Sequence, residues 1–120
     1  MYIKDRKDCK EITAIDGTRL RELLNPRLEQ QLGFRYSLAE ARVKPGRETL
    51  PHRLKTTEVY YFLEGSGEMR IDQERRPVAA GQAVFIPPRS VQSIKNTGRR
   101  DLVFLCIVDP AWRAEDEELA

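Results

Sequence analysis

The chain is patterned in short apolar runs that end at glycine, proline or asparagine, spaced about ten residues apart as in all-β proteins. Phe34–Val43 is a plausible strand that stops at the turn signal Lys44-Pro45-Gly46. Glu58–Glu64 is rich in aromatic and β-branched residues and stops at Gly65-Ser66-Gly67. Leu102–Val108 is a continuous apolar run, typical of a strand that is covered on both faces. These runs predict a β-sandwich or barrel.

The remaining segments fill in the pattern. Glu68–Asp72 alternates polar and apolar residues and predicts a hairpin partner for the strand before it. Val84–Ile86 runs into two prolines, so that strand must end there or lie at a sheet edge. Asp16–Pro26 fits either one helical turn or an N-terminal strand. Arg113–Ala120 is mostly acidic, and we expect a frayed tail or a short helix.

Composition narrows the class of protein. The 120 residues are 40% hydrophobic and 33% charged, as expected for one domain over residues 1–120. The 21 basic and 19 acidic residues are interspersed, which argues against a nucleic-acid surface. No run is long enough to span a membrane, and Met1–Lys10 has no apolar leader. Cys9 and Cys106 have no zinc-type spacing, so we expect a reduced, cytoplasmic protein.

Two stretches have a specific spacing. GRETLPHRLKTTEVYYFLEG runs from Gly46 to Gly65, and GQAVFIPPRSVQSIKN runs from Gly81 to Asn96. They resemble the two motifs of the cupin superfamily, which read Gly, His-x-His, Glu, Gly and then Gly, Pro, Gly, His, Asn. Seven of the ten positions match at the family's spacing: Gly46, His52, Glu58, Gly65, Gly81, Pro87 and Asn96. The resemblance implies an antiparallel jelly-roll β-barrel, a small bacterial-type cupin of the conserved-barrel, mannose-6-phosphate isomerase-like kind. It covers about residues 12–112, which would form the core of the domain, and residues 113–120 would be an acidic C-terminal tail.

The metal-binding part of the motif is degenerate. The resemblance implies a metal held by two histidines and a glutamate of the first motif and a histidine of the second. Leu54 stands at the second of these histidine positions, and Gln92 stands at the last. His52, Glu58 and Gln92 remain as a mixed N/O set, which divalent metals accept, although the loss of two imidazoles weakens affinity. Either one divalent transition metal (Zn, Mn, Fe or Ni) binds here or no cofactor is used.

Strand alternation groups the candidate catalytic residues. His52 and Leu54 face the same way, as do Glu58, Tyr60 and Phe62. Histidine titrates near neutral pH and suits general acid–base catalysis. Glu58 could orient the His52 ring, and Tyr60 could donate a hydrogen bond to a substrate oxygen. The candidate catalytic residues are therefore His52, Glu58 and Tyr60.

Three further residues are candidates for substrate binding. Gln92 could bind a carbonyl or hydroxyl group, Arg42 precedes the first motif on a strand, and Phe62 shares the face of Glu58. Cys106 lies in the middle of an apolar run, where a cysteine usually acts as a small hydrophobic residue rather than a nucleophile.

These residues favour an enzyme of the lyase or isomerase class. It would dehydrate, epimerise or isomerise a small polar carbonyl or sugar-like substrate. The alternative is a non-catalytic module that binds a small molecule. A metal-dependent dioxygenase ranks third, because the non-haem iron triad needs two histidines and one carboxylate. The resemblance also implies a homodimer, formed through an outer sheet face if Val103, Leu105 and Ile107 point outward.

Overall fold

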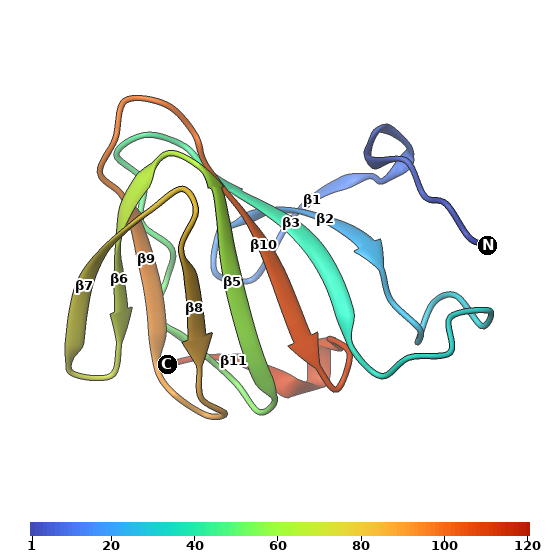
Figure 1. Cartoon of the computed structure of the whole chain (residues 1–120). Helices are drawn as coiled ribbons and strands as arrows, with labels where there is room; N and C mark the ends of the chain where they lie inside the picture. The colour runs from blue at the N-terminus through green and yellow to red at the C-terminus, as the bar shows by residue number, and fades with distance from the viewer.

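Strands make up nearly all the regular structure of the computed structural model, which describes residues 1–120 (Figure 1). Two 3-10 turns, η1 (Arg6–Asp8) and η2 (Ala114–Asp116), lie near the two ends of the chain. The strands are β1 (Glu11–Thr13), β2 (Arg19–Leu24), β3 (Ser37–Val43), β4 (His52–Leu54), β5 (Thr57–Glu64), β6 (Ser66–Ile71), β7 (Glu74–Ala79), β8 (Ala83–Ile86), β9 (Gln92–Asn96), β10 (Leu102–Asp109) and β11 (Glu117–Leu119). No helix is long and apolar enough to cross a membrane.

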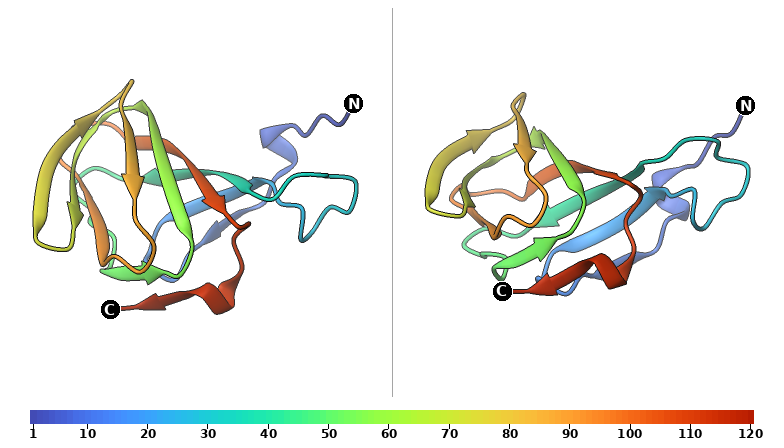
Figure 2. Two further views of the ribbon diagram at one scale, coloured as in Figure 1. Left: turned by 60° about the horizontal axis from the view of Figure 1, so that its bottom comes forward. Right: turned by 90° about the horizontal axis from the view of Figure 1, so that it is seen from below.

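The strands form two antiparallel sheets that enclose the core (Figures 1 and 2). The larger sheet has the order β1-β2-β3-β10-β5-β8, and the smaller has the order β11-β4-β9-β6-β7. Neighbours in these sheets are far apart in the sequence, as when β10 pairs with both β3 and β5. This arrangement confirms the expected antiparallel jelly-roll barrel.

Strand β10 lies at the centre of the larger sheet, which explains its continuous apolar sequence. Its inward residues Leu102, Phe104, Cys106 and Val108 are all buried. The Phe104 ring lies 4.5 Å from the Tyr60 ring and 5.3 Å from the Phe62 ring, centroid to centroid. Aromatic contacts across two strands therefore fill this part of the core.

The segment that fitted either a helical turn or a strand, Asp16–Pro26, forms a strand. Asp16–Pro26 contains β2, which pairs with β1 on one edge and β3 on the other, so the helical alternative is wrong. The strand predicted over Phe34–Val43 begins at Ser37.

The C-terminal segment, expected to be a frayed tail or a short helix, consists of the short 3-10 turn η2 followed by a strand. After η2, the chain forms β11, which pairs antiparallel with β4, so that Glu117 lies opposite Leu54 and Leu119 opposite His52. The backbone N–H of Ala120 also donates to the Pro51 carbonyl (3.0 Å). Backbone groups make this pairing, so the acidic side chains of the segment could not be used to predict it. Residues expected to fray instead extend the smaller sheet (Figure 2).

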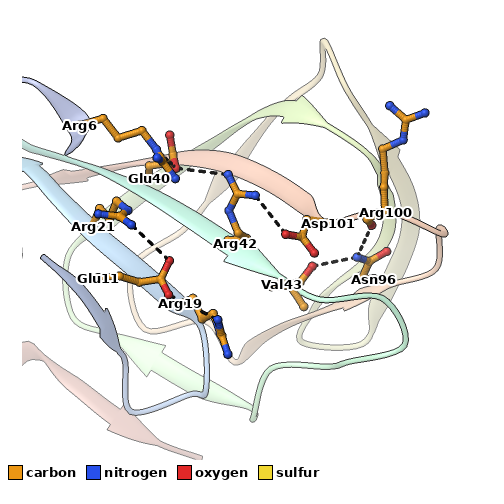
Figure 3. A network of polar contacts seen from close by, with 10 residues as sticks. All are labelled: Arg6, Glu11, Arg19, Arg21, Glu40, Arg42, Val43, Asn96, Arg100 and Asp101. Carbon is orange, nitrogen blue, oxygen red and sulfur yellow. Dashed lines mark hydrogen bonds and ion pairs between the residues drawn. The ribbon is translucent and has the colours of Figure 1, made fainter. Parts of the chain in front are cut away.

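Two motif residues have structural roles. Gly65 has φ +86°, and a Cβ there would lie 2.8 Å from the carbonyl oxygen of Asp101, so only glycine fits the turn into β6. The amide nitrogen of Asn96 donates to the carbonyls of Val43 and Arg100, at 2.8 Å each (Figure 3). Its side-chain oxygen accepts from the backbone N–H of Gly98 (2.9 Å). Asn96 therefore ends β9 in a turn, a role that suits the sequence Asn96-Thr97-Gly98.

Candidate functional site

A small cavity lies between the two sheets. Its volume is about 40 Å³, more than a single buried water molecule needs. Ser37 and Ala39 from β3 and Cys106 from β10 line it, and these small inward side chains leave the space open. Burial raises the pKa of the Cys106 thiol well above its usual value, so Cys106 is a protonated wall residue.

His52 is a buried residue of β4 that lines this cavity. Its Nδ1 lies 2.9 Å from the carbonyl oxygen of Leu50 and 3.5 Å from Oδ2 of Asp16. Both neighbours are hydrogen-bond acceptors, so Nδ1 must carry the proton of the neutral ring. No protein group forms a hydrogen bond with Nε2. The surrounding atoms do not enclose Nε2 completely, so it stays accessible. Nε2 is therefore left as an accessible proton acceptor.

Asp16 is the residue that sets the tautomer of His52, together with the Leu50 carbonyl. It lies in the turn between β1 and β2, where Oδ1 accepts from the backbone N–H of Thr18 (3.0 Å) and Oδ2 from the Thr18 hydroxyl (2.8 Å). The sequence Asp-Gly-Thr shows the turn but not its histidine partner. Glu58, which we expected to orient the ring, makes no hydrogen bond to it.

Glu58 belongs to a buried chain of three polar side chains. The amide nitrogen of Gln92 donates to Oε1 of Glu58 (2.9 Å), and the Tyr60 hydroxyl donates to the amide oxygen of Gln92 (2.8 Å). Burial raises the pKa of Glu58 to about 8, against the opposing effect of the Gln92 hydrogen bond. Burial also keeps Tyr60 protonated by raising its pKa. At neutral pH Glu58 therefore holds a proton that it can donate.

Two further carboxyl groups line the cavity, and no motif or spacing in the sequence had selected them. Burial raises the pKa of Glu22, on β2, to about 7. Glu117, on β11, accepts a hydrogen bond from the Trp112 indole N–H (2.6 Å). Both reach the cavity through strand pairings between distant parts of the chain.

The structure brings three of the predicted site residues to the cavity: His52, Glu58 and Tyr60. Gln92 lies behind the wall, where it connects Glu58 to Tyr60. Phe62 is fully buried in the core. Arg42 is turned to the outside of the larger sheet, where it pairs with Asp101 (3.0 Å) and Glu40 (3.8 Å) (Figure 3). Arg42 and Phe62 therefore do not reach the cavity.

The three candidate metal ligands do not fit a metal site in this arrangement. The Gln92 amide oxygen accepts from Tyr60, and its NH₂ group points at Glu58. Leu54 adds a hydrocarbon side chain to the cavity wall. A protonated carboxyl group is a poor ligand, and no group of three His, Cys, Asp or Glu side chains is arranged so that it could hold a metal ion. The expected ligand set of His52, Glu58 and Gln92 is therefore not formed.

A second, larger hollow of about 530 Å³ lies beside β6, β7 and β8. It shares no lining residue with the cavity of His52. Apart from Glu74 and Arg76, its lining residues carry no ionisable side chain. In the larger hollow Glu74 and Arg76 are paired with each other, so the candidate catalytic groups lie in the smaller cavity.

Comparisons with known proteins agree with the fold. Residues 39–108 match the family model described as "Cupin domain". The uncharacterized protein MJ1618 of Methanocaldococcus jannaschii is 42% identical over 105 residues, which cover 87% of this chain and 82% of that protein. The oxalate-binding protein of Thermotoga maritima is 32% identical over 71 residues, covering 58% of this chain and 59% of that protein.

Solved structures share the architecture at low sequence identity. A predicted oxalate decarboxylase of Thermotoga maritima has a TM-score of 0.76 at 23% identity, covering 91% of this chain and 99% of that one. The nucleoside dehydratase Pac13 has a TM-score of 0.79 at 16% identity, covering 100% and 91%. The polyketide cyclase RemF of Streptomyces resistomycificus has a TM-score of 0.75 at 24% identity, covering 97% and 89%. These likenesses establish the fold alone.

The combined substitutions Leu54→His and Gln92→His should create a metal site. They place one imidazole on the cavity wall at position 54 and one at position 92, on the strand paired with that of His52, and they remove the amide that donates to Glu58. We expect affinity for Zn²⁺ or Ni²⁺ to rise by about two orders of magnitude or more, measured by calorimetry and element analysis. The control is Leu54→Met, which should not raise it. Equal affinity in the wild-type protein and the double variant would contradict this description of the site.

The stability of the protein should fall as the pH rises from about 4.5 to about 8. In this range the unfolded chain loses the Glu58 proton, whose ordinary pKa is 4.5, while the folded protein keeps it up to about 8. The contribution is fully present below pH 4.5 and lost above 8, a change of about 3–5 kcal/mol in the free energy of unfolding.

Urea denaturation at several pH values measures this slope. The variant Glu58→Gln should have a flatter profile that keeps only the slope contributed by Glu22, whose pKa is raised to about 7, and Glu64→Gln, an exposed substitution on the same strand, should keep the wild-type slope. Identical slopes in the wild-type protein and Glu58→Gln would show that Glu58 is not held protonated.

Proposed function

Because the chain belongs to the cupin family, we propose that it is an enzyme that moves protons on a small polar substrate, with His52 as the base. The substrate class is a small carbonyl or sugar-like compound, and the reaction is a dehydration, an epimerisation or an isomerisation. The observation that carries the proposal is the position of the His52 ring. Its Nδ1 is held by Leu50 and Asp16, and this leaves Nε2 as the proton acceptor.

The proposed step uses two groups of the cavity. Nε2 of His52 removes a proton from the carbon next to the carbonyl, and the electron pair of that C–H bond forms the double bond of an enol. Glu58 gives its proton to the carbonyl oxygen, which balances the charge. Asp16 stabilises the imidazolium that forms.

The product depends on how the enol reacts next. If a proton returns to the opposite face, the result is an epimer, and if it returns to the neighbouring carbon, the result is an isomer. If a hydroxyl on the next carbon leaves as water with the proton that His52 removed, while the enol returns its proton to Glu58 and the carbonyl re-forms, the result is a dehydration. Solved structures with this fold include a nucleoside dehydratase and a polyketide cyclase by their names, so the fold is compatible with such chemistry.

Hydrogen exchange tests the proposal without knowledge of the natural substrate. Glyceraldehyde, dihydroxyacetone and glucosamine are incubated with the protein in D₂O, and NMR follows loss of the C–H signal next to the carbonyl. We expect the protein to accelerate exchange of at least one compound, and His52→Ala to lower the rate by about 100-fold or more. Asp16→Asn should also lower the rate, because it weakens the hold on the tautomer.

The control variant is Lys55→Ala, an exposed change next to β4 that should leave exchange unaltered. An exchange rate that survives His52→Ala would remove His52 as the base. Saturable binding of these compounds with no exchange would favour the alternative, a cupin that binds a small molecule without transforming it.

We further propose that two copies of the chain pair through the outer face of the larger sheet. Leu105 and Ile107 alternate with the buried residues of β10 and are half-buried, whereas Val103 is buried. On the neighbouring strands β5 and β8, Tyr61 is 41% and Phe85 61% exposed. The register places Tyr61 beside Leu105, and Val59 between Ile107 and Phe85, so these side chains form one apolar face.

The double substitution Tyr61→Glu and Phe85→Glu should abolish this pairing, because it would bury charges in the contact. Light scattering at micromolar concentration should give a dimer for the wild-type protein and a monomer for the variant. Leu28→Glu, at a residue that is 73% exposed in a loop between β2 and β3, is the matched control and should remain dimeric. A monomeric wild-type protein would overturn the proposal.

A further inference from the structure

The cavity of His52 is lined by four carboxyl groups and by no arginine or lysine. The carboxyl groups come from four separate segments: Asp16 from the turn after β1, Glu22 from β2, Glu58 from β5 and Glu117 from β11. The other ionisable side chains in the lining are His52, Tyr60 and Cys106. The wall can therefore carry several negative charges, and at most one positive charge.

The hydrogen-bond donors to these four carboxyl groups are all neutral groups, and each carboxyl group has few of them. Asp16 accepts from Thr18, and Glu117 accepts from Trp112. Glu58 accepts one hydrogen bond, from Gln92, and the donor nearest to Glu22 is the amide of Asn25, at 3.5 Å. Apart from the His52 ring beside Asp16, no basic group forms an ion pair with them.

The carboxylates on the outside of the barrel are different. Glu11, Glu40 and Asp101 each pair with an arginine at the surface of the larger sheet (Figure 3). Buried carboxyl groups ordinarily have a cationic partner, because an isolated buried charge is costly. The pairing that the surface groups receive from arginine is missing inside the cavity, where the Nε2 atom of the buried His52 also lacks a protein partner.

We propose that the cavity takes a small organic cation, an amine that also carries a hydroxyl or carbonyl oxygen, and that it excludes carboxylate and phosphate anions. This inference deepens the proposed function, because it names the charge of the substrate at the same site. The ammonium group would lie among the carboxyl groups, and the oxygen would face His52 and Glu58.

The apolar part of the wall also suits a cation. Tyr60, Phe104 and Trp112 contribute aromatic surface, and aromatic faces attract organic cations. The indole N–H of Trp112 is held by Glu117, so that ring has a fixed orientation. An anion would meet the carboxyl groups without a basic side chain to compensate its charge. We therefore expect oxalate, the ligand in the name of one relative, not to bind here.

Three probes of almost equal size separate charge from shape: ethanolamine, ethylene glycol and glycolate. Each is titrated into the protein at pH 8, above the pKa of Glu22, while NMR follows the indole N–H signal of Trp112, the single tryptophan of the chain. We expect saturable shifts with ethanolamine, much weaker ones with ethylene glycol and none with glycolate.

The variant Glu22→Gln should weaken ethanolamine binding by about fivefold, the size expected for one partly screened ion pair, and leave ethylene glycol unchanged. Glu64→Gln makes the same charge change at an exposed position outside the cavity and should not affect ethanolamine. Glycolate or ethylene glycol binding as tightly as ethanolamine would overturn the inference. No saturable binding of ethanolamine, or equal weakening by both variants, would also overturn it.

These outcomes are separable from those of the proposed function, because they measure equilibrium binding. A preference for the cation with no hydrogen exchange on any substrate keeps the inference and removes the catalytic proposal. Exchange that depends on His52, together with tighter binding of glycolate, keeps the catalytic proposal and removes the inference.

Discussion

The pairing of β10 with both β3 and β5 is the constraint on which the cavity depends. It fixes the register of three central strands, and their inward side chains change from large to small along the barrel. Phe62 and Phe104 pack against each other in the core, whereas Ser37, Ala39 and Cys106 leave space beside Tyr60. A close-packed interior has few voids, so a cavity at this position follows from which residues the register brings together.

A neutral hydrogen-bonded chain occupies the positions where the family pattern has metal ligands. Gln92 satisfies both Tyr60 and Glu58 with one amide group, and Leu54 keeps the neighbouring wall apolar. The apolar surroundings keep the Glu58 carboxyl neutral, and Asp16 holds the His52 ring from the other side. The two groups are thus prepared for opposite tasks, one as a proton donor and one as an acceptor.

The sequence predicted the parts of the site that depend on local spacing. His52, Glu58 and Tyr60 reach the cavity because strand alternation over a few residues decides which way a side chain faces. Asp16, Glu22 and Glu117 could not be predicted, because they reach the cavity through contacts between separate segments: Asp16 with His52, β2 with β3, and β11 with β4. Arg42 was assigned to the pocket on its sequence position, but alternation along β3 turns it outward, toward Asp101.

The pairing of β11 with β4 has a practical consequence for handling this protein. The last residues run antiparallel to the strand that contains His52. The backbone N–H of Ala120 donates to the carbonyl of Pro51, the residue just before His52. The N-terminal residues, by contrast, extend away from the barrel (Figures 1 and 2). An affinity tag or fusion partner joined after Ala120 would pull on the backbone beside the proposed base. One joined before Met1 would leave that backbone undisturbed.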